Sequence, residues 1–344
     1  MAKRKSKSNF SLWKIVLIFA TSIVLIILGY TIAIMTQSNK VELDEPLEVP
    51  MNTSTEGVVK LLNKEGMLNP IGYNLFVLRA LAFLEGKKIY AGYYDFHDGI
   101  TNYQVIKKLI NGDKLPSLKV TLIPNATYKQ FAEILASKIN FNKEKFLKLC
   151  ESDSLLKARN IVAPSVDGYL APDTYEFYYK HPADKLLDKL LNQQDKVFSE
   201  NFNDRLQLSK YTKTQILTMA SIVQGETNLP DEGKKVAGLY YNRLNIKMPL
   251  QADPTVLYAL GKKKRLLYKD LEIESPYNTY RVTGLPPGPI GNPSKSAIEA
   301  AINPDKHSYL FMVAKGDGTY RHNFSKSLNE HNHFVAEYRK KVNN

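Results

Sequence analysis

The stretch Thr218-Met-Ala-Ser-Ile-Val-Gln-Gly-Glu-Thr227 lies near the C-terminal end of a predicted helix over residues 213–227. Apolar residues recur in this helix at the spacing that forms one buried face, namely at Ile216, Met219, Ala220 and Val223. Glu226 falls on the same face, where an ordinary amphipathic helix has an apolar residue. Asn228 and Pro230 then end the helix.

A carboxyl held against apolar surface is disfavoured in its charged form, so we expect the pKa of Glu226 to lie above its usual value of about 4.3. A general acid that works near neutral pH needs a pKa of roughly 6 to 7, which requires that the ionised form be destabilised by about 3 kcal/mol. The alternative from the pattern alone is that the helix frays after Val223, which would leave Glu226 as a solvated end residue.

Composition predicts a folded chain. Of its 344 residues 44% are hydrophobic and 10% aromatic, which is enough for substantial cores. The formal net charge is +13, but six basic residues precede the first acidic one, Glu42: Lys3, Arg4, Lys5, Lys7, Lys14 and Lys40. No basic run with interleaved aromatic residues follows residue 40, so no nucleic-acid partner is predicted. An anionic polymer or a membrane surface fits the charge equally well.

The cysteine and histidine positions favour neither a disulfide framework nor a metal site. Cys150 is the only cysteine. Among the six histidines only His331 and His333 are close together, on a segment that reads as the polar surface of a helix. No metal and no cofactor are predicted.

Residues 15–35 form a run of 21 residues without a charge, long enough to cross about 30 Å of hydrocarbon as a helix. Because nearly all the neighbouring basic residues precede this run, the basic tail 1–14 is predicted to stay in the cytoplasm. A cleaved signal peptide is the alternative, but the run exceeds the usual 7–15 apolar residues and residues 36–40 offer no small-x-small cleavage site. We therefore predict a signal anchor at 15–35, followed by an extended linker over residues 36–52.

From residue 53 short helices alternate with strands. Strand candidates at 88–94 and 118–123 are each followed by a helix that opens with a capping box, at Thr101 with Gln104 and at Thr127 with Gln130. Such a repeat suits either a small carbohydrate-binding module or a packing arm, and the spacing does not choose between them.

The C-terminal part combines helices, long loops and a hairpin. A helix is predicted from Pro230, and loops rich in rings and turn formers occupy 276–280 and 284–293, where a site is expected. A hairpin over 309–324 and a terminal helix over 328–341 complete a mixed α+β fold.

Six spaced motifs complete the sequence evidence: Ala220-Ser-Ile-Val-x-x-Glu-Thr227, Tyr241-Asn-Arg-Leu244, Leu250-Gln-x-Asp-Pro-Thr-Val256, Tyr277-Asn-Thr-Tyr280, Thr283-Gly-Leu-Pro-Pro-Gly288 and Ser327-Leu-x-x-His-Asn332. In these motifs and their order the chain resembles the endolytic murein transglycosylases, the YceG-like family. One departure is Gln224, where relatives often carry a glutamate. Because helix positions two apart point about 200° from each other, Gln224 is not expected to replace Glu226.

The resemblance implies a LysM-like small domain at 53–125, a YceG-like catalytic domain at 126–344 and Glu226 as the catalytic acid/base. It implies a substrate of peptidoglycan glycan strands, and its possible protein partners are peptidoglycan synthases of the elongation or division machinery. The catalytic domain would lie outside the cytoplasmic membrane on a single-pass anchor. Substrate-binding candidates come from the matched motifs, each equally open to a structural role: Asn242, Gln251, Asp253, Tyr277, Asn278 and Tyr280.

Most glycosidases need two carboxyl groups, whereas by this resemblance a lytic transglycosylase manages with one. Glu226 would protonate the glycosidic oxygen and then take the proton of the muramic C6 hydroxyl, giving a 1,6-anhydro end. Asp253 is the only other well-placed acid, with a turn-capping role as the alternative. Two other functions remain open: a muramidase that uses water through Glu226 and Asp253, and a non-catalytic wall-binding or division scaffold.

Overall fold

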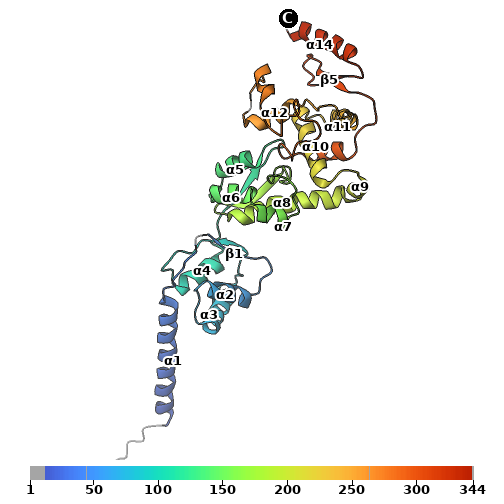
Figure 1. The fold of residues 1–344 in the computed structure, drawn as a ribbon. Helices are drawn as coiled ribbons and strands as arrows, with labels where there is room; N and C mark the ends of the chain where they lie inside the picture. The colour runs from blue at the N-terminus through green and yellow to red at the C-terminus, as the bar shows by residue number, and fades with distance from the viewer. Residues whose placement is uncertain (1–11, 44, 263, 343–344) are drawn as a thin grey trace, which may run out of the picture. The chain divides into compact units, whose positions relative to one another are not determined.

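The computed structural model describes residues 12–43, 45–262 and 264–342. Residue contacts divide the chain into two units, residues 1–116 and residues 117–344. Both units mix helices with two-stranded antiparallel sheets, so the fold is α+β as predicted (Figure 1).

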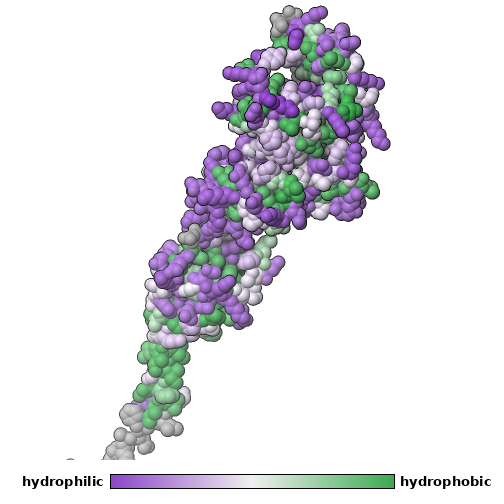
Figure 2. Space-filling view, viewed as in Figure 1, coloured by the Kyte–Doolittle hydropathy of each residue, from purple (hydrophilic) through white to green (hydrophobic). Residues whose placement is uncertain are grey.

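The first element, α1 (Leu12–Thr36), is a 25-residue helix that is apolar over nearly its whole length. Within the described residues it is the one helix long and apolar enough to cross a membrane. Most of its large side chains are exposed, and Figure 2 shows it as a continuous hydrophobic surface. A helix of this kind serves as a membrane anchor or as a signal sequence.

The small unit adds three helices and one two-stranded sheet to α1. Its remaining elements are β1 (Leu47–Val49), α2 (Thr55–Lys64), α3 (Ile71–Leu84), β2 (Gly92–Tyr94) and α4 (Asn102–Asn111). Leu47 of β1 lies opposite Tyr94 of β2. Helix α4 begins with the predicted capping box of Thr101 and Gln104 and ends at Gly112 in the left-handed conformation.

The predicted linker, residues 36–52, is instead part of the small unit. Asn39, Val41 and Val49 are buried, and Ser38 forms a β-bridge with Thr101. Val41 and Val49 belong to the core of that unit, and the backbone of Asn39 exchanges hydrogen bonds with those of Gly99 and Ile100. These residues are therefore folded into the unit.

The boundary between the two units lies between residues 116 and 117, and not at the predicted residue 125. The reason is strand pairing. The strand β3 (Ser117–Thr121) pairs with β4 (Thr174–Tyr178), which lies far along the chain in the large unit. The two predicted strand-helix repeats therefore belong to different units, and their strands have different partners.

One part of the large unit is built on the β3–β4 pair. Its helices are α5 (Tyr128–Ala136), α6 (Lys143–Cys150), α7 (Asp153–Ala158), α8 (Ala183–Asn201) and α9 (Asn203–Leu208). Phe131, Phe146 and Phe177 are fully buried in the core, and α5 opens with the predicted box of Thr127 and Gln130. The apolar faces of α5, α6 and α8 supply about half of the buried residues of this core.

The rest of the large unit surrounds α10 (Lys213–Glu226). It contains α11 (Pro230–Asn245), α12 (Asp253–Leu260), the 3₁₀ helix η1 (Tyr268–Glu272) and α13 (Lys295–Ile302). Every residue of α10 from Ile216 to Gln224 is buried. The predicted single buried face was therefore too narrow, because α11, α12 and α13 all pack against this helix.

The predicted hairpin and terminal helix are confirmed. The hairpin consists of β5 (Phe311–Ala314) and β6 (His322–Ser325), and α14 (Leu328–Val342) packs against it. The buried carboxylate of Glu232 on α11 accepts a hydrogen bond from the backbone N–H of His322 at 2.8 Å. It also contacts the ring nitrogen Nδ1 of His322 at 3.1 Å. This contact holds the hairpin against α11.

Candidate active site

Glu226 is the last residue of α10, and the geometry of the helix end fixes its position. Thr227 leaves the helix in an extended conformation while its N–H still donates to the Val223 carbonyl at 3.0 Å. The Thr227 hydroxyl then accepts from the N–H of Leu229, and Pro230 begins α11. The alternative, fraying of the helix after Val223, does not occur, because α10 stays hydrogen-bonded through Glu226.

The Glu226 carboxyl faces a cavity of about 210 Å³ between α10, α11, the start of α12 and the hairpin. Four predicted site residues meet there: Glu226, Gln251, Asp253 and Tyr280. Tyr240, Arg243 and His322 line the same cavity. The volume is below the roughly 300–1,000 Å³ of pockets that enclose a small molecule, which suits one section of a longer ligand.

Burial raises the pKa of Glu226 to about 7, and the negative charge of Asp253 acts in the same direction. Two groups oppose this shift. The Tyr240 hydroxyl donates to Glu226 Oε1 at 2.6 Å, and the Arg243 guanidinium favours the charged carboxylate. Among the described residues no group donates to Glu226 Oε2, so that oxygen can reach a ligand in the cavity. A carboxyl whose pKa lies near neutral pH can serve as both acid and base.

Arg243 is buried, and its position is fixed by backbone carbonyls. Its Nε donates to the Leu310 carbonyl at 2.6 Å and its Nη1 donates to the Leu250 carbonyl at 2.5 Å. Burial lowers its pKa from the ordinary arginine value. The side chain thus ties α11 to the segments before α12 and β5, and it brings a positive charge close to Glu226.

Asp253 lines the same cavity, from the first turn of α12. The Tyr280 hydroxyl donates to its Oδ1 at 2.6 Å. The loop before α12 is joined to the loop of Tyr280, because Thr279 accepts the Gln251 N–H at its carbonyl and the Ala252 N–H at its hydroxyl, each at 3.0 Å. Gln251 has φ of 48°, a left-handed conformation that is uncommon outside glycine and frequent at functional sites.

The structure places three predicted substrate-binding residues outside this cavity. Asn278 is fully buried, and its amide donates to the carbonyls of Leu271 and Ile273, both at 2.8 Å. The amide of Asn242 donates to the carbonyls of His307 and Tyr309 at 2.8 and 3.1 Å. In these positions both asparagines hold loops in place and leave no amide hydrogen for a ligand.

Gln224 points away from Glu226, as the helix geometry predicted. Its Oε1 accepts from the N–H and the hydroxyl of Ser294, at 3.1 and 2.5 Å, and its Nε2 donates to Asn228. It does not line the Glu226 cavity. Gln224 therefore connects α10 to the segment that begins α13.

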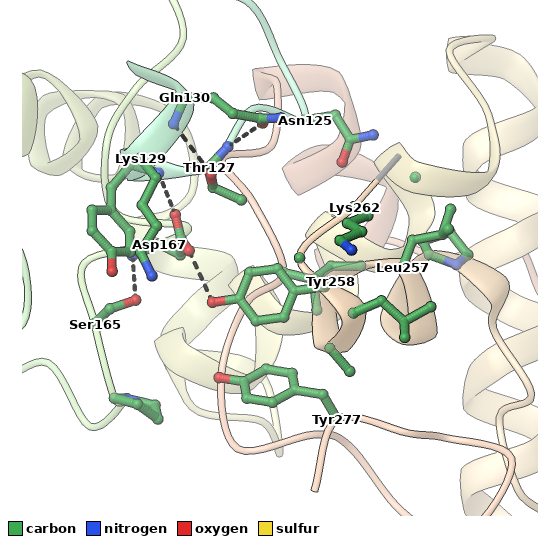
Figure 3. Close-up of a pocket in the computed structure, with 18 of the residues that line it drawn as sticks. Asn125, Thr127, Lys129, Gln130, Ser165, Asp167, Leu257, Tyr258, Lys262 and Tyr277 are labelled. Atoms are coloured by element: carbon green, nitrogen blue, oxygen red, sulfur yellow. Dashed lines mark hydrogen bonds between the residues drawn. The ribbon is translucent and has the colours of Figure 1, made fainter. Parts of the chain in front are cut away.

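Tyr277 lines a second and larger cavity of about 790 Å³ (Figure 3). Its ring contacts that of Tyr258 with 4.8 Å between centroids. Asp167 lies at this cavity too and is 1% exposed; it accepts from the Tyr128 N–H at 2.7 Å and the Tyr258 hydroxyl at 3.0 Å. The two cavities share a wall, since Gly225 and Pro254, the neighbours of Glu226 and Asp253, line this one.

Burial also raises the pKa of Asp167 to about 7, so the pKa alone does not select Glu226 as the acid. The two carboxyls differ in their hydrogen bonding. Both oxygens of Asp167 are occupied by groups of the protein, which makes it a link between α5 and α12. Glu226, in contrast, has one carboxyl oxygen that receives no hydrogen bond among the described residues, and it shares its cavity with the carboxyl of Asp253.

Sequence reasoning did not select Tyr240, Arg243 and His322. Tyr240 and Arg243 are three positions apart on α11 and so share one face of this helix. A tyrosine and an arginine together on a buried face are a usable signal, because buried polar groups require partners. His322 had no such signal, because the hairpin reaches the site only through the tertiary fold.

The fold and this site define a mixed α+β protein with an acid of raised pKa in a polar cavity. The model of the YceG-like family matches residues 47–337, and the chain belongs to that family. It is 32% identical over 308 residues to the endolytic murein transglycosylase of Bacillus subtilis, covering 85% of this chain and 84% of that relative.

Two further proteins extend the comparison. The endolytic murein transglycosylase of Streptococcus pneumoniae (strain D39) is 28% identical over 84% of this chain, which spans 57% of that relative's length. A crystal structure of a yceG-like protein from Listeria monocytogenes matches with a TM-score of 0.57 and 32% identity, covering 84% of this chain and 97% of that one.

Proposed function

We propose that this chain is a membrane-anchored endolytic lytic transglycosylase that cuts the β-1,4 bond between N-acetylmuramic acid and N-acetylglucosamine in peptidoglycan strands. The observation that carries the proposal is Glu226, whose carboxyl has a pKa of about 7 and one oxygen open to a polar cavity. The endolytic murein transglycosylases that this chain resembles over most of its length support the reaction and the substrate.

In the proposed reaction Glu226 first donates its proton to the glycosidic oxygen as the bond to the muramic C1 breaks. The resulting carboxylate then accepts the proton of the muramic C6 hydroxyl while that oxygen bonds to C1. The products are a free N-acetylglucosamine hydroxyl and a 1,6-anhydro-muramic end, and Glu226 regains its proton. No water is consumed, so a single carboxyl serves both steps.

Asp253 would act through its charge. A second carboxylate in the cavity stabilises the positive charge that develops at C1 in an oxocarbenium-like transition state. Its hydrogen bond from Tyr280 fixes its direction. The competing muramidase needs Asp253 to activate a water molecule or to attack C1 itself, so the same pair of residues serves either chemistry.

The remaining site residues receive distinct proposed roles. Gln251 and Tyr280, which line the Glu226 cavity, would contact the sugars next to the cut bond. Tyr277, in the larger cavity with Tyr258, would stack on a more distant part of the strand. Asn242 and Asn278 would support the loops that carry these residues. The small unit would be the LysM-like module that the resemblance implies.

The membrane part of the proposal assigns α1 as an uncleaved anchor with the basic tail in the cytoplasm. Both units would then lie outside the cytoplasmic membrane, where nascent strands are made. Peptidoglycan synthases of the elongation or division machinery would supply these strands.

Mass spectrometry of products from purified, uncrosslinked glycan strands tests the reaction. We expect internal cuts whose muramic ends are one water lighter than hydrolysed ends, and no cutting by the Glu226→Gln protein. Reducing ends that carry the full water would show a muramidase. No cutting by the intact protein would favour the non-catalytic scaffold.

A further inference from the structure

Helix α3 exposes apolar side chains where a helix of a soluble unit has polar ones. Phe76, Phe83 and Leu84 are 67%, 85% and 77% exposed. Gly72, Phe76, Arg79 and Phe83 follow one another at helical spacing along this exposed face, and Arg79 is the only charged residue of the helix. We call Phe76, Phe83 and Leu84 the α3 apolar face.

The opposite face of α3 is already used for packing. Asn74 and Leu78 are fully buried, and α3 contacts both α2 and α4. A helix that is apolar all round is normally enclosed by protein or by lipid. No described residue of the small unit covers the α3 apolar face, so its partner lies outside this unit.

Helix α3 begins beside the membrane-crossing helix. The rings of Tyr73 and Tyr30 meet edge to face with 5.2 Å between centroids, and the Tyr73 hydroxyl forms a short hydrogen bond with that of Thr31. Thr31 lies four residues before the end of the uncharged run, about 6 Å along the helix axis. Tyr73 is thus at the level where α1 passes from its exposed apolar part into the small unit.

The end of α1 is also joined firmly to the small unit. Ile34 and Met35 are buried in that unit's core, and the Asn102 amide donates to the Ile34 carbonyl at 2.9 Å. These contacts join the anchor directly to the folded small unit. Figure 1 shows α3 beside the upper end of α1, at the side of the small unit from which α1 extends. The bilayer surface that α1 crosses therefore meets α3.

The α3 apolar face lies on the same side of the helix as Tyr73, which contacts α1. At 3.6 residues per turn, Phe76 and Phe83 lie less than about a quarter turn around the helix from Tyr73, and Leu84, three turns further on, lies on the side of Tyr73 itself. The side of α3 that meets α1 thus continues into exposed phenyl and leucyl groups.

We propose that α3 is a second membrane element, which lies in the boundary of the bilayer where α1 leaves it. Phe76, Phe83 and Leu84 enter the acyl-chain region, as apolar faces of interfacial helices do over about 5–10 Å. Arg79, which lies on the same exposed side of α3, extends to the lipid phosphates. The inference rests on the proposed membrane anchoring by α1. In this arrangement two helices, α1 and α3, hold the small unit on the bilayer.

Tryptophan fluorescence of the full chain in lipid nanodiscs tests this proposal. The chain has a single tryptophan, Trp13 at the start of α1, so a Trp13→Phe background with Phe83→Trp or Phe76→Trp reports one position each. We expect blue-shifted emission that brominated acyl chains quench about as strongly as they quench native Trp13. Tyr320→Trp, at an 89% exposed position of the hairpin loop in the large unit, is the matched control and should not be quenched.

Each outcome decides a different point. Quenching of Trp13 without quenching at positions 76 and 83 overturns the α3 proposal and keeps the anchor. A blue shift at position 83 without quenching by brominated lipid shows cover by protein and also overturns it. Loss of quenching at Trp13 itself removes the anchoring on which the inference rests. Thermal unfolding of each variant, compared with the parent, checks that the tryptophans leave the fold intact.

Discussion

Glu226 is the residue on which the proposed activity depends, and its replacement by Gln removes the proton while keeping the shape of the side chain. We expect Glu226→Gln to lower the rate of strand cutting by about a hundredfold or more, as loss of a general acid does. Folding should be retained, because a neutral amide is easier to bury than a carboxylate. Product release per mole of folded protein is the measurement, and near-normal cutting would contradict the assignment.

Asp167 offers a matched control, since it is a second buried carboxyl with a pKa of about 7. The pKa of an aspartate in the unfolded chain is about 3.9. Between about pH 4 and pH 7 the folded state therefore binds one proton that the unfolded state has lost. The stability that Asp167 contributes falls as the pH rises through this range. The difference is about 4 kcal/mol at most. We expect Asp167→Asn to flatten this slope in unfolding measurements and to retain cutting activity.

Replacing Tyr240 or Asp253 should shift the pH dependence of the cutting rate in opposite directions. The Tyr240 hydroxyl stabilises the carboxylate, so Tyr240→Phe should raise the pKa of Glu226 and move the loss of activity on the alkaline side to higher pH. The charge of Asp253 destabilises that carboxylate, so Asp253→Asn should move the same limb to lower pH. Rate profiles between pH 5 and 9 measure both, and shifts in the same direction would reject this electrostatic account.

Asp253→Asn carries a second expectation. It should slow the cut without changing the product end, because Asp253 acts through its charge and not by activating water. A change from anhydro to hydrolysed ends in this variant would assign Asp253 a different chemical role.

Among the elements, the close approach of α10 and α12 sets the geometry of the site. A Cβ on Gly225 would lie 2.6 and 2.7 Å from two carbons of Pro254, closer than real contacts allow. Gly225 directly precedes Glu226, and Pro254 directly follows Asp253. Only glycine lets the two helices bring both carboxyls to one cavity.

We therefore expect Gly225→Ala to push α12 away, to lower stability by about 1–3 kcal/mol and to reduce cutting more than this loss explains. Gly233→Ala is the control, because its new Cβ would meet its nearest neighbours at 3.4 and 3.5 Å, an ordinary contact distance. Denaturant unfolding and turnover on the same samples separate the two effects. Equal activity in both variants would remove the positioning role from Gly225.

At the scale of the whole molecule, anchoring and orientation decide where the cavity works. If α1 crosses the membrane with its basic end in the cytoplasm, a reporter fused after the last residue should be active only when it is an extracytoplasmic type. Activity of a cytoplasm-only reporter at that end would reject the orientation. A shortened chain that begins after α1 in cells would instead indicate a cleaved signal sequence.

The sequence alone determined the elements whose signals are local. The uncharged run, the capping boxes at Thr101 and Thr127, and the helix that ends in Glu226 depend on residues within a few positions of one another, and the structure contains all of them. Family motifs added the assignment of Glu226, which periodicity had left open between an acid and a frayed end.

Only the tertiary structure decided which residues surround Glu226. Tyr240, Arg243 and His322 come from two elements that meet through the contact between Glu232 and the hairpin, and no spacing in the sequence records that contact. Asn242 and Asn278, in contrast, sit in matched motifs but bind backbone carbonyls. A motif shows that a residue matters, whereas its hydrogen-bond partners, set by the packing of distant segments, decide whether it faces the ligand or the chain itself.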